Sequence, residues 1–248
     1  MMRLLSAVTA IVAVSWSLSA LAEGQLCTGV PMLGADNSGA APQLAIVTSR
    51  GRLHFVKGSE QAGCPSAKAT CAMGAFVVVG DPVVVSTTAG DYACATFTGP
   101  VPNAFSTSGF LPRSQLGAPP QDAHVDASAA WAGVWRSGDE QTITIKPEPD
   151  GRIAIEGEAT WGSHDPERVK RGGVNMGDIE AEVRIADGAV AFAIDYDGAT
   201  KPFDFKQADN SDLCRVKLWR LGPYLVASDN LRCGGMNVTF TGLYRKAE

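Results

Sequence analysis

Histidine is the usual base of a nucleophilic active site, and this chain has three histidines: His54, His124 and His164. Such a site also needs an activated nucleophile and a group that orients the base. No Gly-x-Ser-x-Gly segment occurs in the sequence, and none of the histidines lies in a catalytic motif. His54 alternates with Phe55 on a β-rich run, and His124 lies in a segment where a solvated side chain is expected. The sequence therefore predicts a protein that is not an enzyme.

Two groups of acidic residues could in principle do chemistry. Glu156 and Glu158 lie on one face of a predicted strand, and glycosidases work with a pair of carboxylates, but acidic residues on a solvent-facing strand are ordinary. The segment 195–198 begins like a calcium loop, but Lys206 occupies the position of its last ligand. We therefore interpret 195–198 as a hairpin turn and expect neither a metal nor a cofactor.

A basic segment is the strongest candidate for a contact surface. The sequence predicts a loop of about 16 residues from Gly162 to Gly177. Its candidate binding residues are His164, Arg168, Lys170 and Arg171. On an acidic chain, such a loop would suit an anionic partner, although a solvated turn stabilised by Asp165-Pro166 is the alternative.

Six cysteines predict three disulfides in an oxidising compartment. The two in the second half, Cys214 and Cys233, would pair with each other. The other four allow three connectivities, of which we favour Cys27 with Cys94 and Cys64 with Cys71. A zinc site is disfavoured because no Cys-x-x-Cys pair occurs and only His54 lies nearby.

The first 22 residues have the pattern of a secretory signal peptide. Arg3 precedes an apolar run that ends near a small-residue cleavage site, so we expect cleavage after Ala22. Cys27 lies too far downstream for lipidation, and no later segment has the roughly 20 apolar residues of a spanning helix. The prediction is a periplasmic or secreted protein without a membrane anchor.

Charge and composition divide the remaining chain into two halves. Residues 23–120 carry five acidic and five basic residues, whereas 21 acidic and 15 basic residues follow. All four tryptophans after residue 22 also lie in the second half. We predict one domain at 23–116, a Pro-containing linker at 117–130 and a second domain at 131–248. Because the chain is acidic and lacks a basic block, a nucleic-acid partner is not expected.

The first half predicts short strands separated by Gly, Pro and Asp turns. The expected strands are 44–48, 53–56, 75–79, 82–86, 92–97 and 107–111. The stretches 76–85, 92–97 and 107–116 resemble a bacterial Src-homology-3-like domain, with Phe110 where that family usually has a Gly-Trp pair. The resemblance implies a small β-barrel that binds cell-wall peptide or an envelope protein, with Tyr92, Phe97 and Phe110 as candidate ligand contacts.

The second half predicts eight antiparallel strands, because apolar and polar residues alternate along it. The expected strands are 133–137, a run around Ile143 and Ile145, 153–160, 179–185, 189–195, 212–221, 224–228 and 238–245. Asp-Gly pairs at 150–151, 187–188 and 197–198 predict two-residue hairpins. Eight such strands can close an up-and-down barrel, so the fold class is all-β. The segment Trp131-Ala132-Gly133-Val134-Trp135 resembles the Gly-x-Trp start of lipocalin- and avidin-type barrels.

The tail, residues 229–245 with its Cys-Gly-Gly-Met-Asn-Val segment, is similar to one in secreted proteins of Gram-negative bacteria, some of which also carry a lysozyme-inhibitor-like segment. The leading functional prediction is a binding protein for cell-wall peptide or an envelope protein. A lysozyme inhibitor is the alternative. A small-ligand carrier is a third, since Ala189, Ala191 and Ala193 could leave space inside the barrel.

Overall fold

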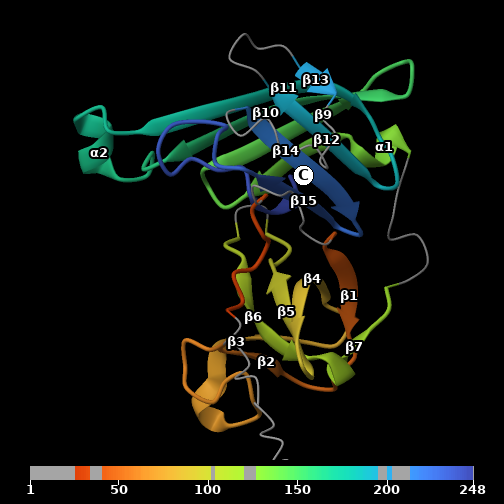
Figure 1. The fold of residues 1–248 in the computed structure, drawn as a ribbon, viewed down its shortest axis with the longest axis vertical. Helices are drawn as coiled ribbons and strands as arrows, with labels where there is room; N and C mark the ends of the chain where they lie inside the picture. Colours follow the sequence, from red (N-terminus) through yellow and green to blue (C-terminus); the bar gives the residue numbers. More distant parts are fainter. Residues whose placement is uncertain are drawn as a thin grey trace, which may run out of the picture.

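The computed structural model describes residues 26–33, 41–101, 104–119, 127–194, 200–202 and 213–247. Almost all regular structure in them is antiparallel β, which confirms the all-β prediction. The strands form two sheets. All strands of the first sheet come before residue 118 in the chain, and all strands of the second come after residue 132. Figure 1 shows the two sheets stacked end to end.

The first sheet has seven strands in the order β3-β2-β6-β5-β4-β1-β7 and is curved like half a barrel. The strands are β1 (Gln43–Val47), β2 (Leu53–Val56), β3 (Ala72–Val77), β4 (Pro82–Ala89), β5 (Tyr92–Phe97), β6 (Thr107–Pro112) and β7 (Leu116–Gly117). Two single-turn 3-10 helices, η1 (Ala69–Cys71) and η2 (Arg113–Gln115), precede β3 and β7. The six predicted strands therefore exist, and only β7 was missed.

Two small apolar clusters hold the first sheet together. One surrounds Phe55 and Leu111, which are both fully buried. The other is built around the disulfides Cys27–Cys94 and Cys64–Cys71 and includes Phe110. The predicted pairing of the four cysteines is confirmed, because each bridge joins segments that the sheet brings within reach.

The second sheet has nine strands in the order β11-β10-β9-β8-β16-β15-β14-β12-β13. Its strands are β8 (Gly133–Ser137), β9 (Gln141–Pro147), β10 (Arg152–Trp161), β11 (Asn175–Arg184), β12 (Ala189–Ile194), β13 (Thr200–Pro202), β14 (Cys214–Leu221), β15 (Tyr224–Asp229) and β16 (Gly242–Lys246). The first and last strands in chain order, β8 and β16, pair with each other. The two edge strands of the sheet also meet, because β11 lies near β12 and β13, so the sheet is a nearly closed barrel. The predicted up-and-down barrel is confirmed, with short β13 as an additional edge strand.

The hairpin turns differ in how well the Asp-Gly signal predicted them. Asp187 and Gly188 both have positive φ angles, 51° and 68°, as a two-residue turn of this kind requires. The loop between β9 and β10 instead has four residues, 148–151, and only Gly151 has a positive φ. The Asp197-Gly198 pair lies outside the described residues.

Large side chains fill the barrel interior. Trp131, Trp135, Phe192 and Phe240 are each 0 % exposed and belong to one apolar cluster. On β12 the residues in this cluster are Val190 and Phe192, whereas Ala189 packs on the opposite side, against the other sheet. The alanine alternation therefore does not produce a hollow in the barrel.

Two short helices fall in segments that were expected to lack structure. Helix α1 (Ser128–Trp131) occupies the end of the predicted linker, where buried Trp131 accepts a hydrogen bond at its carbonyl from Trp135 Nε1 at 2.9 Å. Helix α2 (Pro166–Lys170) lies at the tip of the long β10–β11 hairpin, which projects beyond the rest of the molecule in Figure 1.

A mixed apolar and polar interface joins the two sheets. Leu44 and Val84 of the first sheet pack with Trp219, Tyr224 and neighbours of the second. The Tyr224 hydroxyl donates to the carbonyl oxygens of Pro82 and Thr98, at 2.9 and 3.2 Å. Because both sheets contribute buried atoms to the same cluster, the surface between them has a fixed shape.

Candidate functional site

A cavity of about 680 Å³ lies beside this interface. The N-terminal segment and the β5–β6 region of the first sheet form one wall, and the β8–β9 turn, the β10–β11 hairpin and the 230–241 loop form the other. Hydroxyl groups, three carboxylates, one guanidinium and two aromatic rings line it. The charged and aromatic lining residues are Phe105, Asp139, Glu140, Trp161, His164, Asp165 and Arg168.

Helix α2 positions the charged side of the cavity. Asp165 caps the helix by accepting hydrogen bonds from the backbone N–H groups of Glu167 and Arg168, at 3.0 and 3.3 Å, and Pro166 occupies the first helical position. The predicted loop of about 16 residues therefore has a short capped helix at its centre, and its Asp165-Pro166 pair starts that helix. The cap fixes where the Arg168 side chain leaves the backbone.

Arg168 lies flat on Trp161. Its guanidinium carbon is 3.8 Å from the ring centroid, and its Nε lies 3.5 Å from Asp165 Oδ2. The side-chain stem of Arg168 passes directly over Gly162, where a Cβ atom would lie 2.6 Å from Arg168 Cδ. Gly162 also has a φ of +84°, so the stacked arrangement depends on glycine at this position.

Glu140 connects the β8–β9 turn to the β10–β11 hairpin. Its Oε1 accepts hydrogen bonds from the Ser163 backbone N–H at 2.7 Å and from the Ser163 hydroxyl at 2.9 Å. A ring nitrogen of neighbouring His164 lies 3.4 Å from the Asp139 carbonyl oxygen. These contacts hold the β8–β9 turn, which carries Asp139 and Glu140, against Ser163 and His164 of the hairpin.

The first sheet contributes a smaller, mostly neutral wall. Phe105 is 79 % exposed and projects next to Gly138 across the cavity. Thr96 and Ser108 hydrogen-bond to each other through their hydroxyl groups at 3.0 Å. This wall therefore offers one exposed ring and several hydroxyl groups to a ligand.

The 230–241 loop closes the cavity from the barrel side. Buried Asp229 accepts hydrogen bonds from the Thr239 and Thr241 hydroxyls, at 2.6 and 2.8 Å, and from the Phe240 N–H at 3.0 Å. Phe240 enters the barrel core, while Asn237 and Thr239 face the cavity. The predicted disulfide Cys214–Cys233 is confirmed and ties the start of this loop to β14.

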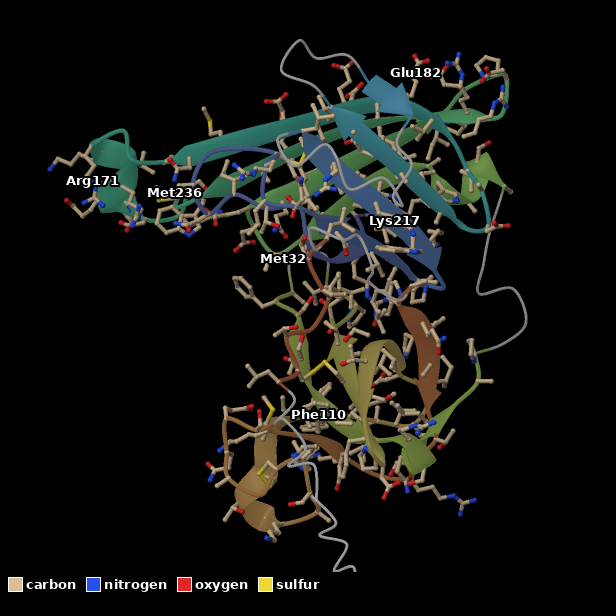
Figure 2. All side chains as sticks on the ribbon, in the orientation of Figure 1. Met32, Phe110, Arg171, Glu182, Lys217 and Met236 are labelled. Carbon is tan, nitrogen blue, oxygen red and sulfur yellow. A yellow bond between two sulfur atoms is a disulfide. The ribbon has the colours of Figure 1, made fainter. Side chains whose placement is uncertain are left out.

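The Cys-Gly-Gly-Met-Asn segment of the tail has a structural role that its sequence did not reveal. Gly177 of β11 lies against the Cys233 carbonyl, and a Cβ on Gly177 would lie 2.7 Å from Gly234 Cα. The Gly235 N–H donates to the Met176 carbonyl at 3.0 Å, and Figure 2 shows Met236 beside the projecting hairpin. Glycine is needed because two backbones touch here.

The structure brings only part of the predicted basic surface into the cavity. His164 and Arg168 line it, whereas Lys170 and Arg171 do not and are exposed at the tip of the hairpin. Figure 2 shows Arg171 at that tip, away from the first sheet. Sequence reasoning missed Trp161 and Phe105, whose importance depends on contacts between distant segments.

The aromatic residues proposed for the first half lie elsewhere. Phe110 is 0 % exposed within the disulfide cluster, so its ring is not available to a ligand. Tyr92 packs beside the same cluster, and Phe97 packs against the core around Phe55. None of the three lines the cavity. The reason is that β5 and β6 have both faces covered, so alternation along them does not mark a solvent-facing side.

The remaining candidates have ordinary environments. Glu156 is paired with Lys146 at 3.0 Å on the exposed face of the sheet, and a His54 ring nitrogen lies 3.0 Å from the Met73 carbonyl oxygen. Segment 195–198 lies outside the described residues. Within the described ranges, no group of three or more potential metal-ligating side chains occurs.

Comparison with protein-family models, with curated proteins and with solved structures gives no match for this chain. The resemblances to Src-homology-3-like domains and to lipocalin- and avidin-type barrels therefore stay predictions. No helix in the described part of the chain is long and apolar enough to cross a bilayer.

Proposed function

We propose that this chain is an exported binding protein that holds a peptide segment of the bacterial cell wall in the cavity between its two sheets. The observation that carries the proposal is the cavity itself. At about 680 Å³ it has the size of a small-molecule or short-peptide site, and such sites commonly lie where two structural units meet.

The chemistry of the lining supports a peptide ligand. Cell-wall peptides carry free amino and carboxylate groups as well as backbone amides. Asp139 and Glu140 of the β8–β9 turn suit an amino group, and Arg168 of α2 suits a carboxylate. Other lining hydroxyl groups, such as those of Thr28, Ser106 and Ser137, can donate to or accept from amides.

The setting supports export. Three disulfides indicate an oxidising, extracytoplasmic environment. Together with the predicted signal peptide, they support a periplasmic or secreted protein that meets cell-wall fragments.

Binding rather than turnover is proposed because the cavity holds no activated nucleophile in the described residues. None of their hydroxyl groups hydrogen-bonds to His164, whose ring nitrogen faces the backbone carbonyl of Asp139 instead. Nucleophilic catalysis would require that contact.

The test is isothermal titration calorimetry of the chain from Glu23 with soluble cell-wall tetrapeptide. Ser106→Trp fills the cavity from an exposed position, and we expect it to weaken binding at least tenfold. Thr88→Trp, at an exposed position of β4 outside the cavity, is the matched control and should bind like the unaltered protein. Absence of binding to the unaltered chain, or equal binding by the Ser106→Trp variant, would contradict the proposal.

The projecting hairpin favours a second candidate, a lysozyme inhibitor. Lys170 and Arg171 are exposed at its tip, and the active cleft of a lysozyme contains two carboxylates that such a tip could meet. If the hairpin inserts there, the chain should slow lysis of bacterial cells by lysozyme, and alanine at Arg168, Lys170 and Arg171 together should remove that effect. Undiminished inhibition by the triple variant would exclude the hairpin as the inhibitory element.

A further inference from the structure

Arg168 differs from Arg220 and Arg245, two arginines of the second sheet that also lie over aromatic rings. Arg220 lies over Trp135, but its Nη1 donates to the Tyr224 carbonyl at 3.1 Å and its Nε to the Ala130 carbonyl at 3.3 Å. Arg245 lies over Tyr224, and its Nη2 donates to the Thr98 carbonyl at 3.0 Å. Those two guanidinium groups are used to join parts of the fold.

The Arg168 guanidinium is held in place by its neighbours, but its outer N–H groups remain available to a ligand. Trp161 covers one face of it, and Asp165 lies beside Nε. Among the described residues, no atom accepts a hydrogen bond from Nη1 or Nη2, and these atoms belong to a side chain that lines the cavity. A guanidinium stacked over a ring keeps its outer N–H groups in its own plane, beside the ring face, where they form a pair of parallel donors.

Two parallel donors at fixed spacing match the two oxygens of a carboxylate. The Arg168 side chain is 30 % exposed, so part of the water that would weaken such a pair is already excluded by Trp161 and by the stem packing on Gly162. Lysine could not reproduce the arrangement, because an ammonium group provides neither the flat stack nor the paired donors.

The other charges around the cavity restrict which carboxylates can enter. Asp139, Glu140 and Asp165 give the lining more negative than positive charge. A ligand with only negative groups would therefore be repelled, whereas one that also carries an amino group could pair with Arg168 and with these carboxylates.

We propose that Arg168, stacked on Trp161, is the receptor for a carboxylate of a ligand that also carries an amino group. This inference rests on the proposed function and names the group that the cavity recognises. The carboxylate could come from the cell-wall peptide or from an amino sugar acid such as muramic acid, and the experiment separates these sources.

Intrinsic fluorescence gives a local readout. Of the four tryptophans in the described residues, Trp131, Trp135 and Trp219 are buried and only Trp161 is partly exposed. A ligand that pairs with Arg168 should therefore change the fluorescence of Trp161 and reduce its quenching by acrylamide.

The experiment titrates the full exported chain with three probes: the cell-wall tetrapeptide, the same peptide with all its carboxylates converted to amides, and muramic acid. We expect the free peptide to bind at least tenfold more tightly than the amidated peptide. We also expect Arg168→Lys and Arg168→Gln each to weaken binding of the free peptide at least tenfold while leaving the weak binding of the amidated peptide unchanged. Arg171→Lys, on the same helix but outside the cavity, should bind like the unaltered chain.

The outcomes distinguish a failure of the Arg168 carboxylate receptor from a failure of peptide binding as the function. Equal binding of the free and amidated peptides, or unchanged binding by both Arg168 variants, overturns the carboxylate receptor but leaves peptide binding in place. Binding of muramic acid alone, lost on Arg168→Lys, supports the receptor and overturns the peptide as its source. Failure of all three probes overturns both. Circular dichroism of each variant confirms that the β fold is retained.

Discussion

Tyr244 is a side chain whose ionisation the fold strongly opposes. It is 0 % exposed inside the barrel, and its hydroxyl donates to the Phe240 carbonyl at 2.7 Å. Burial raises the pKa of Tyr244 well above the ordinary value of 10.0, and the nearby carboxylate of Asp229 raises that pKa further. The phenol therefore stays neutral in the folded protein at pH values where an exposed tyrosine loses its proton.

This difference predicts how stability depends on pH. The unfolded chain binds fewer protons than the folded one above about pH 10, so the contribution of Tyr244 is fully present below that pH and is lost as the pH rises towards the folded-state pKa. Tyr244→Phe should lower the free energy of unfolding by about 1 to 2 kcal/mol at pH 8, because the Phe240 carbonyl loses its donor. The difference in the free energy of unfolding between the unaltered protein and Tyr244→Phe should shrink by about 1 kcal/mol for each pH unit above 10. Urea unfolding at pH 8, 10 and 11 measures it, and parallel pH profiles would contradict the assignment.

Residue types indicated part of the candidate site. The clustered charge of 162–177 predicted His164 and Arg168, which do line the cavity. The roles of Trp161 and Phe105 could not be predicted, because the cavity exists only where segments about 56 residues apart in the chain meet. Phe110 was an incorrect candidate for a related reason, since whether a strand has a solvent-facing side depends on what covers it.

Among the elements, the strands were predictable and the short helices were not. Alternation of apolar and polar residues places β8 to β12 nearly where the structure has them, because one side of each strand faces the barrel core. Helix α2 has only five residues, too few for a helical period to be seen. Its start was nevertheless present in the sequence, as an Asp followed by a Pro, which is a common helix N-terminus.

The contact between β11 and the 230–241 loop gives a prediction at the scale of elements. In Gly177→Ala the new methyl group would meet the Cys233 carbonyl, so the loop must shift away from the strand. We expect a loss of about 1 to 3 kcal/mol in the free energy of unfolding, in the range of other overpacked sites. Peptide affinity should also fall, because Asn237 and Thr239 of this loop line the cavity.

Gly74→Ala is the matched control for that prediction. Gly74 also lies in a strand, β3, but a Cβ there would have nothing within 4 Å, and its φ is not positive. Urea unfolding and peptide titration of both variants check the expectation. If Gly177→Ala were as stable as Gly74→Ala, the tight contact would not be a constraint on the loop.

At the scale of the whole molecule, the shared cluster around Leu44, Trp219 and Tyr224 predicts that the two sheets unfold together. Leu111 is fully buried in the first sheet, so Leu111→Ala should cost about 2 to 5 kcal/mol. All four tryptophans after residue 22 lie in the second half, so their fluorescence reports on the second sheet and, through Trp219, on the interface between the sheets. We expect Leu111→Ala to shift the fluorescence-detected midpoint of urea unfolding as far as the midpoint seen by circular dichroism.

A surface substitution provides the comparison. Val169 is 54 % exposed on α2, and Val169→Ala should leave both midpoints unchanged. A fluorescence midpoint that stays fixed in Leu111→Ala, while circular dichroism shows a separate earlier transition, would mean that the sheets unfold independently.

Charge asymmetry and the Pro-containing segment did indicate where one sheet ends and the next begins. They carried no information on how the sheets meet, because the interface depends on single residues such as Leu44 and Tyr224 that look like ordinary strand residues in the sequence. The cavity between the sheets follows from that interface, so it could not be predicted either.

The pairing of the first and last strands of the second sheet has a consequence for how the chain reaches its fold. One side of strand β8 pairs with β9, but its other side pairs with β16, where Trp135 and Arg136 lie opposite Lys246 and Arg245, more than a hundred residues later. The barrel therefore stays open between β8 and β15 until β16 is in place. A premature stop before Gly242 would leave β8 and β15 as unpaired edges, which invite aggregation. Residue 247 lies next to β8, because the Ala247 N–H donates to the Val134 carbonyl. We therefore expect this sheet to tolerate circular permutation, with residue 247 joined to the start of β8 and new chain ends in the Asp187-Gly188 turn.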